Sequence, residues 1–511
     1  MAAQIGDLLA MHAQARGDKV ALIHNEREVT FAQLHLRANR VANALRKLGL
    51  ESGDRFAGMA YNGIPGNELT HASRRAGAVG VPISFRLKPA EVAFVINDCE
   101  AKVITAGEEF VPVVEEARKE VVGERIYIAT GGTPPPGWLA YEDLIADSSD
   151  DDLAGDANPV GATMIYTSGT TGRPKGAYRP NGVNIENILQ VIGIFGLGES
   201  DVHLVAGPGY HSAVGFFSYI HQILGATVVL ETKFDAQEAL TLIDRYRVTT
   251  TFMAPTLIAR MLNTPEEFRR TIDHSSMRAM IAGAAPFPFS LKQRCDEYFG
   301  PVLWEFYGAT ETGINTILRP EDQLRKPGSC GTPVPGQEIR LLDEEGVEVP
   351  VGMPGEFFVK HDWLAEYYKR EDATRKSLKD GYFSVGDIAY RDAEDFYYIC
   401  DRKIDMIISG GVNIYPAEIE SVLIAHPAIE DATVIGIPNE EFGEEVKAVV
   451  KLRDGRTATE AEIIEFCGAQ LAGYKRPRTI DFVAELPRST DGKLLKRQVR
   501  DKYWAGSGRT I

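Results

Sequence analysis

Apolar and polar positions in the first 130 residues alternate between two spacings. Residues 20–24 form a short β-rich run, and from Thr30 onward apolar side chains recur at helical spacing, at Phe31, Leu34, Ala38, Val41 and Leu45. The alternation continues with strands predicted at 56–60, 102–105 and 126–128, and helices at 91–99 and 115–121. Such βα alternation is typical of parallel sheets, so the predicted fold class is α/β.

Two stretches interrupt this pattern. Residues 130–160 contain a Gly- and Pro-rich segment and the acidic run 148–152, a composition that predicts surface loop. Near Asp401 the charged stretch Asp401-Arg402-Lys403 precedes a smaller βα alternation that runs to the end. We therefore predict a large N-terminal domain of βα-rich subdomains (1–401) and a small C-terminal α+β domain (402–511).

Composition excludes several classes of protein. The 511 residues are 44% hydrophobic, which is too apolar for a disordered chain, and the net charge of −17 disfavours a nucleic-acid partner. No apolar run approaches the ~18 residues of a membrane helix, and Asp7 interrupts the N-terminus where a signal peptide is apolar, so we expect a cytoplasmic protein without integral membrane association. The cysteines lack metal-ligand spacing and are expected to be reduced thiols: Cys99, Cys295, Cys330, Cys400 and Cys467.

The most informative segment is YTSGTTGRPKG, residues 166–176, which follows a mostly apolar run. Its glycines let the backbone approach an anion, its hydroxyls can donate to phosphate or bind Mg²⁺, and Lys175 adds positive charge. The GxxxxGK[ST] order of a Walker loop is absent. The segment therefore predicts a phosphate-binding loop of another kind.

This segment resembles the [YF]TSG[ST]TGxPKG signature of the adenylate-forming superfamily, which includes acyl-CoA synthetases, nonribosomal-peptide adenylation domains and beetle luciferases. Further motifs of the superfamily follow in its usual order over nearly the whole chain. The resemblance implies that ATP phosphates are bound by Thr167, Ser168, Gly169, Thr170, Thr171, Gly172 and Lys175.

Residues 307–312, YGATET, resemble the YGxTE segment of the superfamily. The resemblance implies that Tyr307 stacks on adenine beside Gly308, and that Glu311 and Thr170 hold Mg²⁺. Upstream, the small residues of 282–286 resemble the loop at the adenine edge, which assigns that edge to Gly283, Ala284 and Ala285.

Residues 382–387, YFSVGD, resemble the [YW][FY]xTGD motif, whose aspartate accepts both ribose hydroxyls. Asp387 is the ribose candidate. Val385 stands where a threonine is usual, which puts the local hydrogen bonding in doubt.

Residues 401–416 resemble the hinge about which the C-terminal domain rotates between two half-reactions. The resemblance assigns Arg402 to the ribose of ATP, and Gly410 and Gly411 to a tunnel for pantetheine. Ile404 stands where many relatives carry Lys or Asp. We expect an apolar hinge residue to slow or bias the rotation.

The remaining motifs concern the reacting acid. Lys493 of PRSTDGK resembles the lysine that reaches the substrate carboxylate and the α-phosphate. His211 lies in a segment resembling the wall of the acyl pocket and is expected to position or gate rather than act as a base, since a carboxylate is already ionised at neutral pH. Lys493, Glu311, Thr170 and His211 are the predicted catalytic residues.

The resemblance predicts a ligase that uses MgATP to convert a carboxylic acid to an acyl-adenylate and transfers the acyl group to coenzyme A. Alternatives are transfer to a carrier protein, a luciferase-like oxidation and a catalytically silent binding protein. Apolar residues after His211 predict a hydrophobic monocarboxylate: Val214, Gly215, Phe216 and Phe217. The oligomeric state stays open, a homodimer included.

Overall fold

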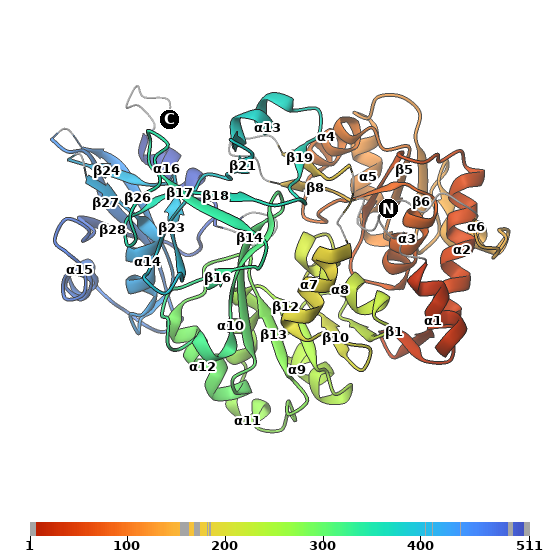
Figure 1. The fold of residues 1–511 in the computed structure, drawn as a ribbon, viewed down its shortest axis with the longest axis horizontal. Coiled ribbons are helices and arrows are strands. Elements are labelled where there is room, and N and C mark those ends of the chain that lie inside the picture. The colour runs from red at the N-terminus through yellow and green to blue at the C-terminus, as the bar shows by residue number, and fades with distance from the viewer. Residues whose placement is uncertain are drawn as a thin grey trace. The chain divides into compact units, whose positions relative to one another are not determined.

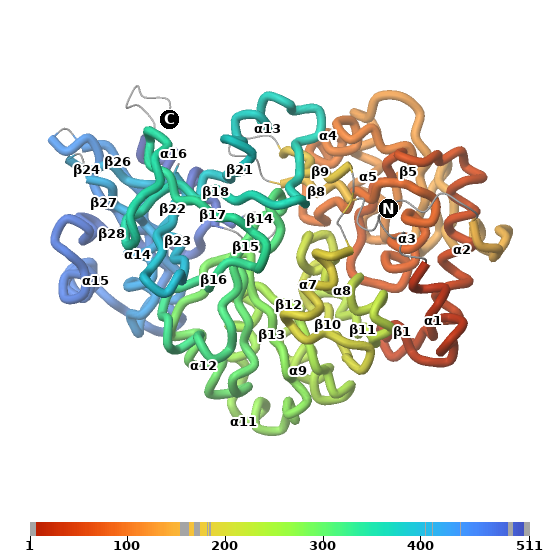
Figure 2. Tube along the Cα trace, viewed as in Figure 1, coloured from red at the N-terminus to blue at the C-terminus, as the bar shows by residue number. Residues whose placement is uncertain are grey.

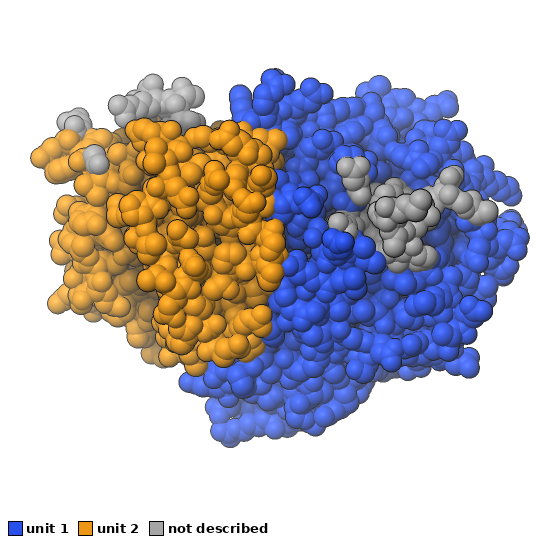
Figure 3. Space-filling model, viewed as in Figure 1, with its two compact units in different colours: residues 1–284, 295–314, 361–376 blue, residues 285–294, 315–360, 377–511 orange. Residues whose placement is uncertain are grey.

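A computed structural model describes residues 7–153, 163–167, 174–180, 182, 185–403, 405–410, 412–439, 441–488 and 494–504. The chain divides into two compact units, coloured separately in Figure 3. Unit 1 comprises residues 1–284, 295–314 and 361–376, and unit 2 comprises 285–294, 315–360 and 377–511. The boundary at 401–402 stays a prediction.

The first sheet of unit 1 is wholly parallel, in the order β4-β3-β5-β6-β7. Figure 1 labels its strands β5 and β6. Its strands are β3 (Arg55–Met59), β4 (Val79–Pro82), β5 (Val103–Ala106), β6 (Ile126–Ala129) and β7 (Leu139–Ala140). The accompanying helices are α1 (Leu8–Arg16), α2 (Phe31–Lys47), α3 (Ile64–Arg75), α4 (Pro89–Cys99), α5 (Val111–Arg118) and α6 (Tyr141–Ala146), with η1 (Glu108–Phe110) before α5. The βα alternation and the α/β class are confirmed.

Helix α2 begins where the sequence predicts. The Oγ1 of Thr30 accepts a hydrogen bond from the backbone N–H of Gln33 (3.3 Å), and the Gln33 side chain accepts one from the backbone of Thr30 (2.9 Å). This capping box satisfies two N–H groups that the first turn leaves without helical partners. The apolar stripe that begins at Phe31 is buried against the rest of unit 1.

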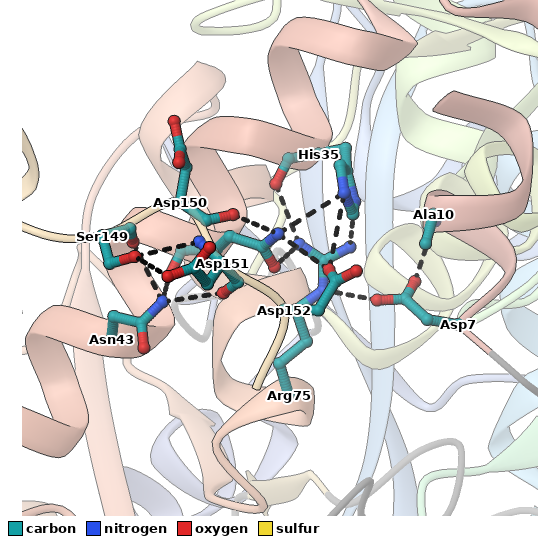
Figure 4. Close-up of polar contacts among 10 residues, drawn as sticks. Asp7, Ala10, His35, Asn43, Arg75, Ser149, Asp150, Asp151 and Asp152 are labelled. Carbon is teal, nitrogen blue, oxygen red and sulfur yellow. Dashed lines mark hydrogen bonds and ion pairs between the residues drawn. The ribbon is translucent and has the colours of Figure 1, made fainter. Parts of the chain in front are cut away.

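The stretch 130–160 is wrongly predicted as loop alone, because it includes β7 and α6. Its acidic run 148–152 lies along α2 (Figure 4). Asn43 donates to the Ser149 carbonyl (2.9 Å), and the Nη2 of Arg75 donates to His35 Nδ1 (2.9 Å). Because arginine can only donate, His35 Nδ1 is the acceptor of this bond, and Nε2 lies 3.5 Å from Asp152 Oδ1.

A second sheet of unit 1 has the order β14-β13-β12-β10-β11-β1-β2, parallel from β13–β14 through β1 and antiparallel only at β2. Its strands are β1 (Val20–His24), β2 (Arg27–Thr30), β10 (Val202–Val205), β11 (Thr227–Leu230), β12 (Thr250–Met253), β13 (Ala279–Ala282) and β14 (Leu303–Ala309). The helices of this part are α7 (Ile185–Phe195), α8 (Ser212–Ile223), α9 (Ala236–Arg245), α10 (Pro255–Leu262) and α11 (Glu266–Arg269); α12 (Phe289–Phe299) and α13 (Glu371–Ser377) each cross a unit boundary.

Unit 2 holds two further sheets. One joins β17 (Glu338–Leu342), β18 (Gly355–Lys360), β20 (Leu378–Lys379), β21 (Tyr382–Phe383), β22 (Asp387–Arg391) and β23 (Tyr397–Arg402). Before them in the chain come β15 (Gly313–Leu318), which crosses the unit boundary, η2 (Pro320–Asp322) and β16 (Thr332–Pro333), which pairs antiparallel with β15. The other, in blue in Figure 2, contains β24 (Ile407–Ser409), β25 (Val412–Ile414), β26 (Ile429–Asn439), β27 (Gly443–Leu452) and β28 (Thr479–Phe482), with helices α14 (Pro416–Ile424), α15 (Glu460–Gly468) and α16 (Lys496–Trp504).

The described part of the chain contains no helix long and apolar enough to cross a membrane. All five cysteines are free thiols, and four of them are buried.

Candidate active site

The carboxyl ends of the parallel strands in the second sheet of unit 1 place the predicted site residues at one edge. Strand β10 leads to His211, β13 to Gly283, and β14 to Glu311. Ligands of open α/β sheets bind at this edge, because the loops that follow the strands meet there. The topology therefore brings residues that are 28 to 100 positions apart in sequence to the same edge of the sheet.

The predicted phosphate loop connects two strands of a small sheet with the order β19-β9-β8: β8 (Met164–Thr167), β9 (Lys175–Tyr178) and β19 (Glu366–Tyr367). Strands β8 and β9 pair antiparallel, with Thr167 opposite Lys175. Thr167 and Lys175 therefore flank the loop as its signature predicts. Ser168, Gly169, Thr170, Thr171 and Gly172 lie outside the described residues.

Glu311 is the best-defined carboxylate of the site. Its side chain is buried, and its Oε1 accepts hydrogen bonds from Thr167 Oγ1 (3.2 Å) and from the hydroxyl of Tyr367 (3.0 Å). Among the described residues, Oε2 accepts no hydrogen bond. Two hydroxyl groups thus fix one oxygen of this carboxylate, and the described residues donate no hydrogen bond to the other.

Tyr367 was missed by sequence reasoning. It lies on β19, and its ring also receives the Lys175 ammonium at 4.8 Å from the centroid. No motif marks this tyrosine, because its role depends on strand pairing with β9 at a separation of about 190 residues. Pairing is a tertiary property that local pattern does not report.

The last turn-side residues of strand β14 include a glycine, Gly308, that is needed for steric reasons. A Cβ added to Gly308 would lie 1.8 Å from the carbonyl oxygen of Gly313, so no other residue fits without moving the backbone. Tyr307, the predicted adenine-stacking residue, directly precedes this glycine and is half-buried. The close approach of the backbone at Gly308 and Gly313 fixes the conformation of the turn that contains Glu311.

The predicted adenine-edge loop begins at Gly283, directly after β13. A Cβ on Gly283 would lie 3.0 Å from the Phe306 carbonyl oxygen, and Ala284 adopts a left-handed backbone with φ of 71°. A non-glycine residue in this region costs about 1 kcal/mol or more, and such strain clusters at functional sites. Ala285 follows in sequence and belongs to unit 2.

His211 precedes the first turn of α8 and is half-buried. Its ring stacks on Phe252 of β12 (centroids 6.2 Å apart, planes at 20°), and Phe252 in turn stacks on Phe217 at 5.6 Å. Val214 and Phe217 are buried, whereas Phe216 and Gly215 are half-buried. The surroundings of His211 are thus aromatic, and the lining of an acyl pocket by these residues stays a prediction.

In unit 2, Asp387 and Arg402 lie directly opposite each other on antiparallel strands β22 and β23. Arg402 Nε lies 3.4 Å from Asp387 Oδ1, and the Arg402 side chain is 44% exposed. The two residues predicted to bind ribose therefore share one register position, and the arginine keeps enough exposure to meet a ligand.

The missing threonine at Val385 is compensated by its neighbour. The hydroxyl of Ser384 accepts a hydrogen bond from Gly386 N (3.0 Å) and donates to Glu356 Oε1 (2.8 Å). Gly386 has a positive φ of 84°, a conformation that glycine adopts without strain. Ser384 thus holds the turn before Asp387, a residue that the motif comparison passed over.

Of the remaining residues singled out in the sequence, the structure describes only Gly410. Gly410 has φ of 58° and donates its N–H to the Phe442 carbonyl (2.8 Å). Ile404, Gly411 and Lys493 lie outside the described residues. Across the described chain, no group of three or more His, Cys, Asp or Glu is arranged to hold a metal by itself.

Comparison with known proteins fits this site. A family model described as AMP-binding enzyme matches residues 9–369, and one described as AMP-binding enzyme C-terminal domain matches residues 418–493. The chain is 33% identical to an indoleacetate–CoA ligase of Aromatoleum aromaticum (97% of this chain, 98% of that protein). It is 32% identical to the fatty acid–[acyl-carrier-protein] ligase ScoC of Streptomyces coeruleorubidus (98% and 97%).

Among solved structures, the anthranilate CoA ligase AuaEII in complex with anthranoyl-AMP aligns with a TM-score of 0.88 and 29% identity, covering 98% of both chains. The first family model alone spans more than half of the sequence. The resemblance read from the motifs is confirmed: the chain belongs to the AMP-binding enzyme family, with the mixed α/β architecture of adenylate-forming enzymes.

Proposed function

We propose that this AMP-forming acid–thiol ligase joins a hydrophobic monocarboxylic acid to coenzyme A through an acyl-adenylate, releasing pyrophosphate and AMP. The observation that carries the proposal is the arrangement of Glu311. Its carboxylate is fixed by one strand of the phosphate-loop hairpin and by β19, and one oxygen is left without a described donor. A buried carboxylate held in this way beside the phosphate-loop hairpin supports a role for Glu311 at the metal–triphosphate.

The donor chemistry fits Mg²⁺ bound together with ATP. Mg²⁺ is commonly held by one or two carboxylates plus substrate phosphates rather than by an all-protein cage, which agrees with a single buried carboxylate beside a hydroxyl-rich loop. Glu311 and Thr170 are the proposed ligands. When bound, the ion supplies positive charge to the phosphates as pyrophosphate leaves.

The protein's remaining contribution to the first step is orientation and charge. Lys175 and Lys493 are proposed to neutralise charge that builds on the phosphates, and Asp387 and Arg402 to hold the ribose. The acid needs no base, because it is ionised at neutral pH. Positioning and preorganised charge are the effects that such a reaction requires.

The second step is attack of a thiol on the acyl-adenylate with AMP as the leaving group. We propose coenzyme A as this thiol, reaching the acyl carbonyl along Gly410 and Gly411. Relatives with both kinds of acceptor are similar to this chain, since AuaEII is named a CoA ligase and ScoC a carrier-protein ligase. Transfer to a carrier protein is therefore the second candidate.

The acid class is inferred from the aromatic surroundings of His211. Phe217, Phe252 and Phe306 have ring centroids 5.6 to 6.3 Å apart, and Phe195 packs on Phe217 at 5.7 Å. A buried second charge on the substrate would cost several kcal/mol without a partner. Fatty, aryl or alicyclic monocarboxylates fit better than amino acids or diacids.

The test is a panel of octanoate, benzoate, indoleacetate, malonate and an amino acid, each with ATP and CoA and analysed for acyl-CoA by mass spectrometry. We expect the highest kcat/KM for an apolar acid. A clear preference for malonate or the amino acid would contradict the acid class. Acyl-adenylate that accumulates without acyl-CoA, and that loads a carrier protein, would favour the second candidate.

Two further points belong to the proposal. A cytoplasmic location would give the enzyme access to ATP and CoA. A measurement of the molecular mass in solution will decide whether the chain forms a homodimer.

A further inference from the structure

Arg179 directly follows β9, the second strand of the phosphate-loop hairpin, and contacts the turn that carries Glu311. Its Nη2 donates to the carbonyl oxygens of Thr310 (2.7 Å) and Glu311 (3.3 Å), and its Nε donates to the carbonyl of Trp363 (2.6 Å). All these residues belong to unit 1. One guanidinium thus binds two segments that are more than 130 residues away in sequence.

The partners of this guanidinium are unusual for an arginine. Within the described chain, no carboxylate lies at ion-pair distance from Arg179. Burial lowers the pKa of Arg179 to about 10, an effect opposed by the negative charge of Glu311. The side chain is still protonated at neutral pH, so its hydrogen bonds to the carbonyls are charge-assisted.

A charge surrounded mainly by neutral carbonyls contributes little to the stability of a fold, because no paired carboxylate offsets the free-energy cost of its desolvation. The hydrogen bonds of Arg179 instead go to the segments that hold Glu311 in place. The carbonyl of Glu311 also accepts a hydrogen bond from Ala365 N (2.8 Å), and Trp363 and Ala365 lead into β19 with Tyr367. Arg179 therefore lies where the hairpin, the Glu311 turn and the segment before β19 meet.

We infer that Arg179 is a positioning residue that fixes the Glu311 carboxylate relative to the phosphate-loop hairpin. This inference rests on the proposed function, in which Glu311 meets the metal–ATP complex. A guanidinium with three donated bonds holds the turn in one orientation, whereas a lysine offers a point charge without the planar fork. Loss of the fork should affect the adenylation step more than the thiol step, which does not use the triphosphate.

The experiment compares Arg179→Lys and Arg179→Met with Arg278→Met as a matched control. Arg278 also donates to a backbone carbonyl, that of Phe195 (3.2 Å), but it pairs with Asp201 and precedes β13, at the opposite edge of the sheet. The Arg278 variant should lower the melting temperature without changing metal or nucleotide dependence.

The first readout needs no turnover: binding of Mn²⁺ with a non-hydrolysable ATP analogue, followed by electron paramagnetic resonance. We expect Arg179→Met to weaken Mn²⁺ binding about tenfold and Arg179→Lys to fall between it and wild type, in the range usual for residues that support a ligand. In kinetics, acid-dependent pyrophosphate–ATP exchange should fall about 10- to 100-fold. Thioester formation from synthetic acyl-adenylate and CoA should stay within about twofold.

The inference is overturned if both half-reactions fall together while Mn²⁺ binding is unchanged, which is the signature of a merely structural arginine. If Arg179→Met does not fold, Arg179→Lys decides by the same readouts. Failure of the proposed function is distinguishable: wild-type protein would then show no acid-dependent exchange, while the Mn²⁺ titration would still report on Arg179.

Discussion

Two carboxylates proposed to bind ATP, Glu311 at the phosphates and Asp387 at the ribose, are supported differently by the residues around them. Glu311 in unit 1 is buried and fixed by two hydroxyl donors, with Arg179 holding its backbone. In unit 2, Asp387 is buried but faces an arginine that is 44% exposed at 3.4 Å. The Glu311 carboxylate is therefore held by hydroxyl groups of the protein, whereas Asp387 faces a guanidinium that is partly open to solvent.

This difference predicts how Glu311 and Asp387 contribute to adenylation. Preorganised groups act on charge that develops in the transition state, and exposed hydrogen-bonding pairs act mostly on binding. Changes at Glu311 and the residues that support it should lower the rate of adenylation, and changes at Asp387 should raise the KM for ATP. The predictions below test that separation.

The largest effect is expected for Lys493→Ala. Lys493 is proposed to contact the α-phosphate and the carboxylate, and its loss should lower adenylation by about 10² to 10³, or roughly 3 to 4 kcal/mol, the magnitude typical of deleting one preorganised donor. Thioester formation from synthetic acyl-adenylate and CoA should suffer less. If that half-reaction collapses as far as the overall reaction, Lys493 does not have the assigned role.

Glu311→Gln should raise the Mg²⁺ concentration needed for half-maximal pyrophosphate release by about 10- to 100-fold, because an amide is a poorer ligand for a hard cation than a carboxylate. The KM for the acid should change little. Glu366→Gln, an exposed position on β19, is the control. An unchanged Mg²⁺ dependence in Glu311→Gln would remove the residue from the metal site.

Asp387→Asn should raise the KM for ATP about tenfold with a smaller change in kcat, since hydrogen bonds to a charged acceptor contribute about 1.5 to 3 kcal/mol. The loss should shrink when 3′-deoxy-ATP replaces ATP, because a hydroxyl partner is then already absent. Asp380→Asn, at an exposed position, is the control. Equal losses with both nucleotides would show that Asp387 does not bind the ribose.

The smallest effect is expected at Glu231, a buried carboxyl group that, unlike Glu311, accepts few hydrogen bonds. Glu231 is 1% exposed; its Oε1 accepts from Asp235 N (2.5 Å), and its buried Oε2 has no hydrogen-bond partner within the described chain. Burial raises the pKa of Glu231 to about 8. The folded state therefore retains this proton over a pH range in which the unfolded chain, with a value near 4.5, has lost it.

The stability that this proton contributes is complete below about pH 4.5 and is lost as pH rises through about 8. Glu231→Gln removes the ionisation and should be more stable than wild type at pH 9, on the order of 2 kcal/mol, with little difference near pH 5. Thermal unfolding at both pH values measures this. Exposed Glu238→Gln should show no such dependence, and parallel pH profiles of wild type and Glu231→Gln would contradict the raised pKa.

Local pattern predicted much of this molecule. Helix α2 begins at its capping box, and β1 has the expected bounds. These predictions succeed because capping and periodicity are properties of short segments. The motifs assigned roles to Glu311, Asp387 and Arg402, and those roles stay predictions.

Most of the features that the sequence did not predict depend on tertiary contacts. Tyr367 and Arg179 act on Glu311 across separations of 56 and 132 residues, through strand pairing and contacts with backbone carbonyls that carry no residue signature. Ser384 replaces the hydroxyl expected one position later. Helix α6 was hidden by the surrounding Gly, Pro and Asp, whose loop preference was overridden by packing of Tyr141 and Ile145 against the core.

The central claim is that the acid is activated by ATP before the thiol takes part. The direct test is exchange of labelled pyrophosphate into ATP by wild-type protein, with and without the preferred acid and with and without CoA. We predict exchange that requires the acid, does not require CoA and is lost in Glu311→Gln at low Mg²⁺. Exchange that requires CoA, or formation of ADP in place of AMP, would contradict the account.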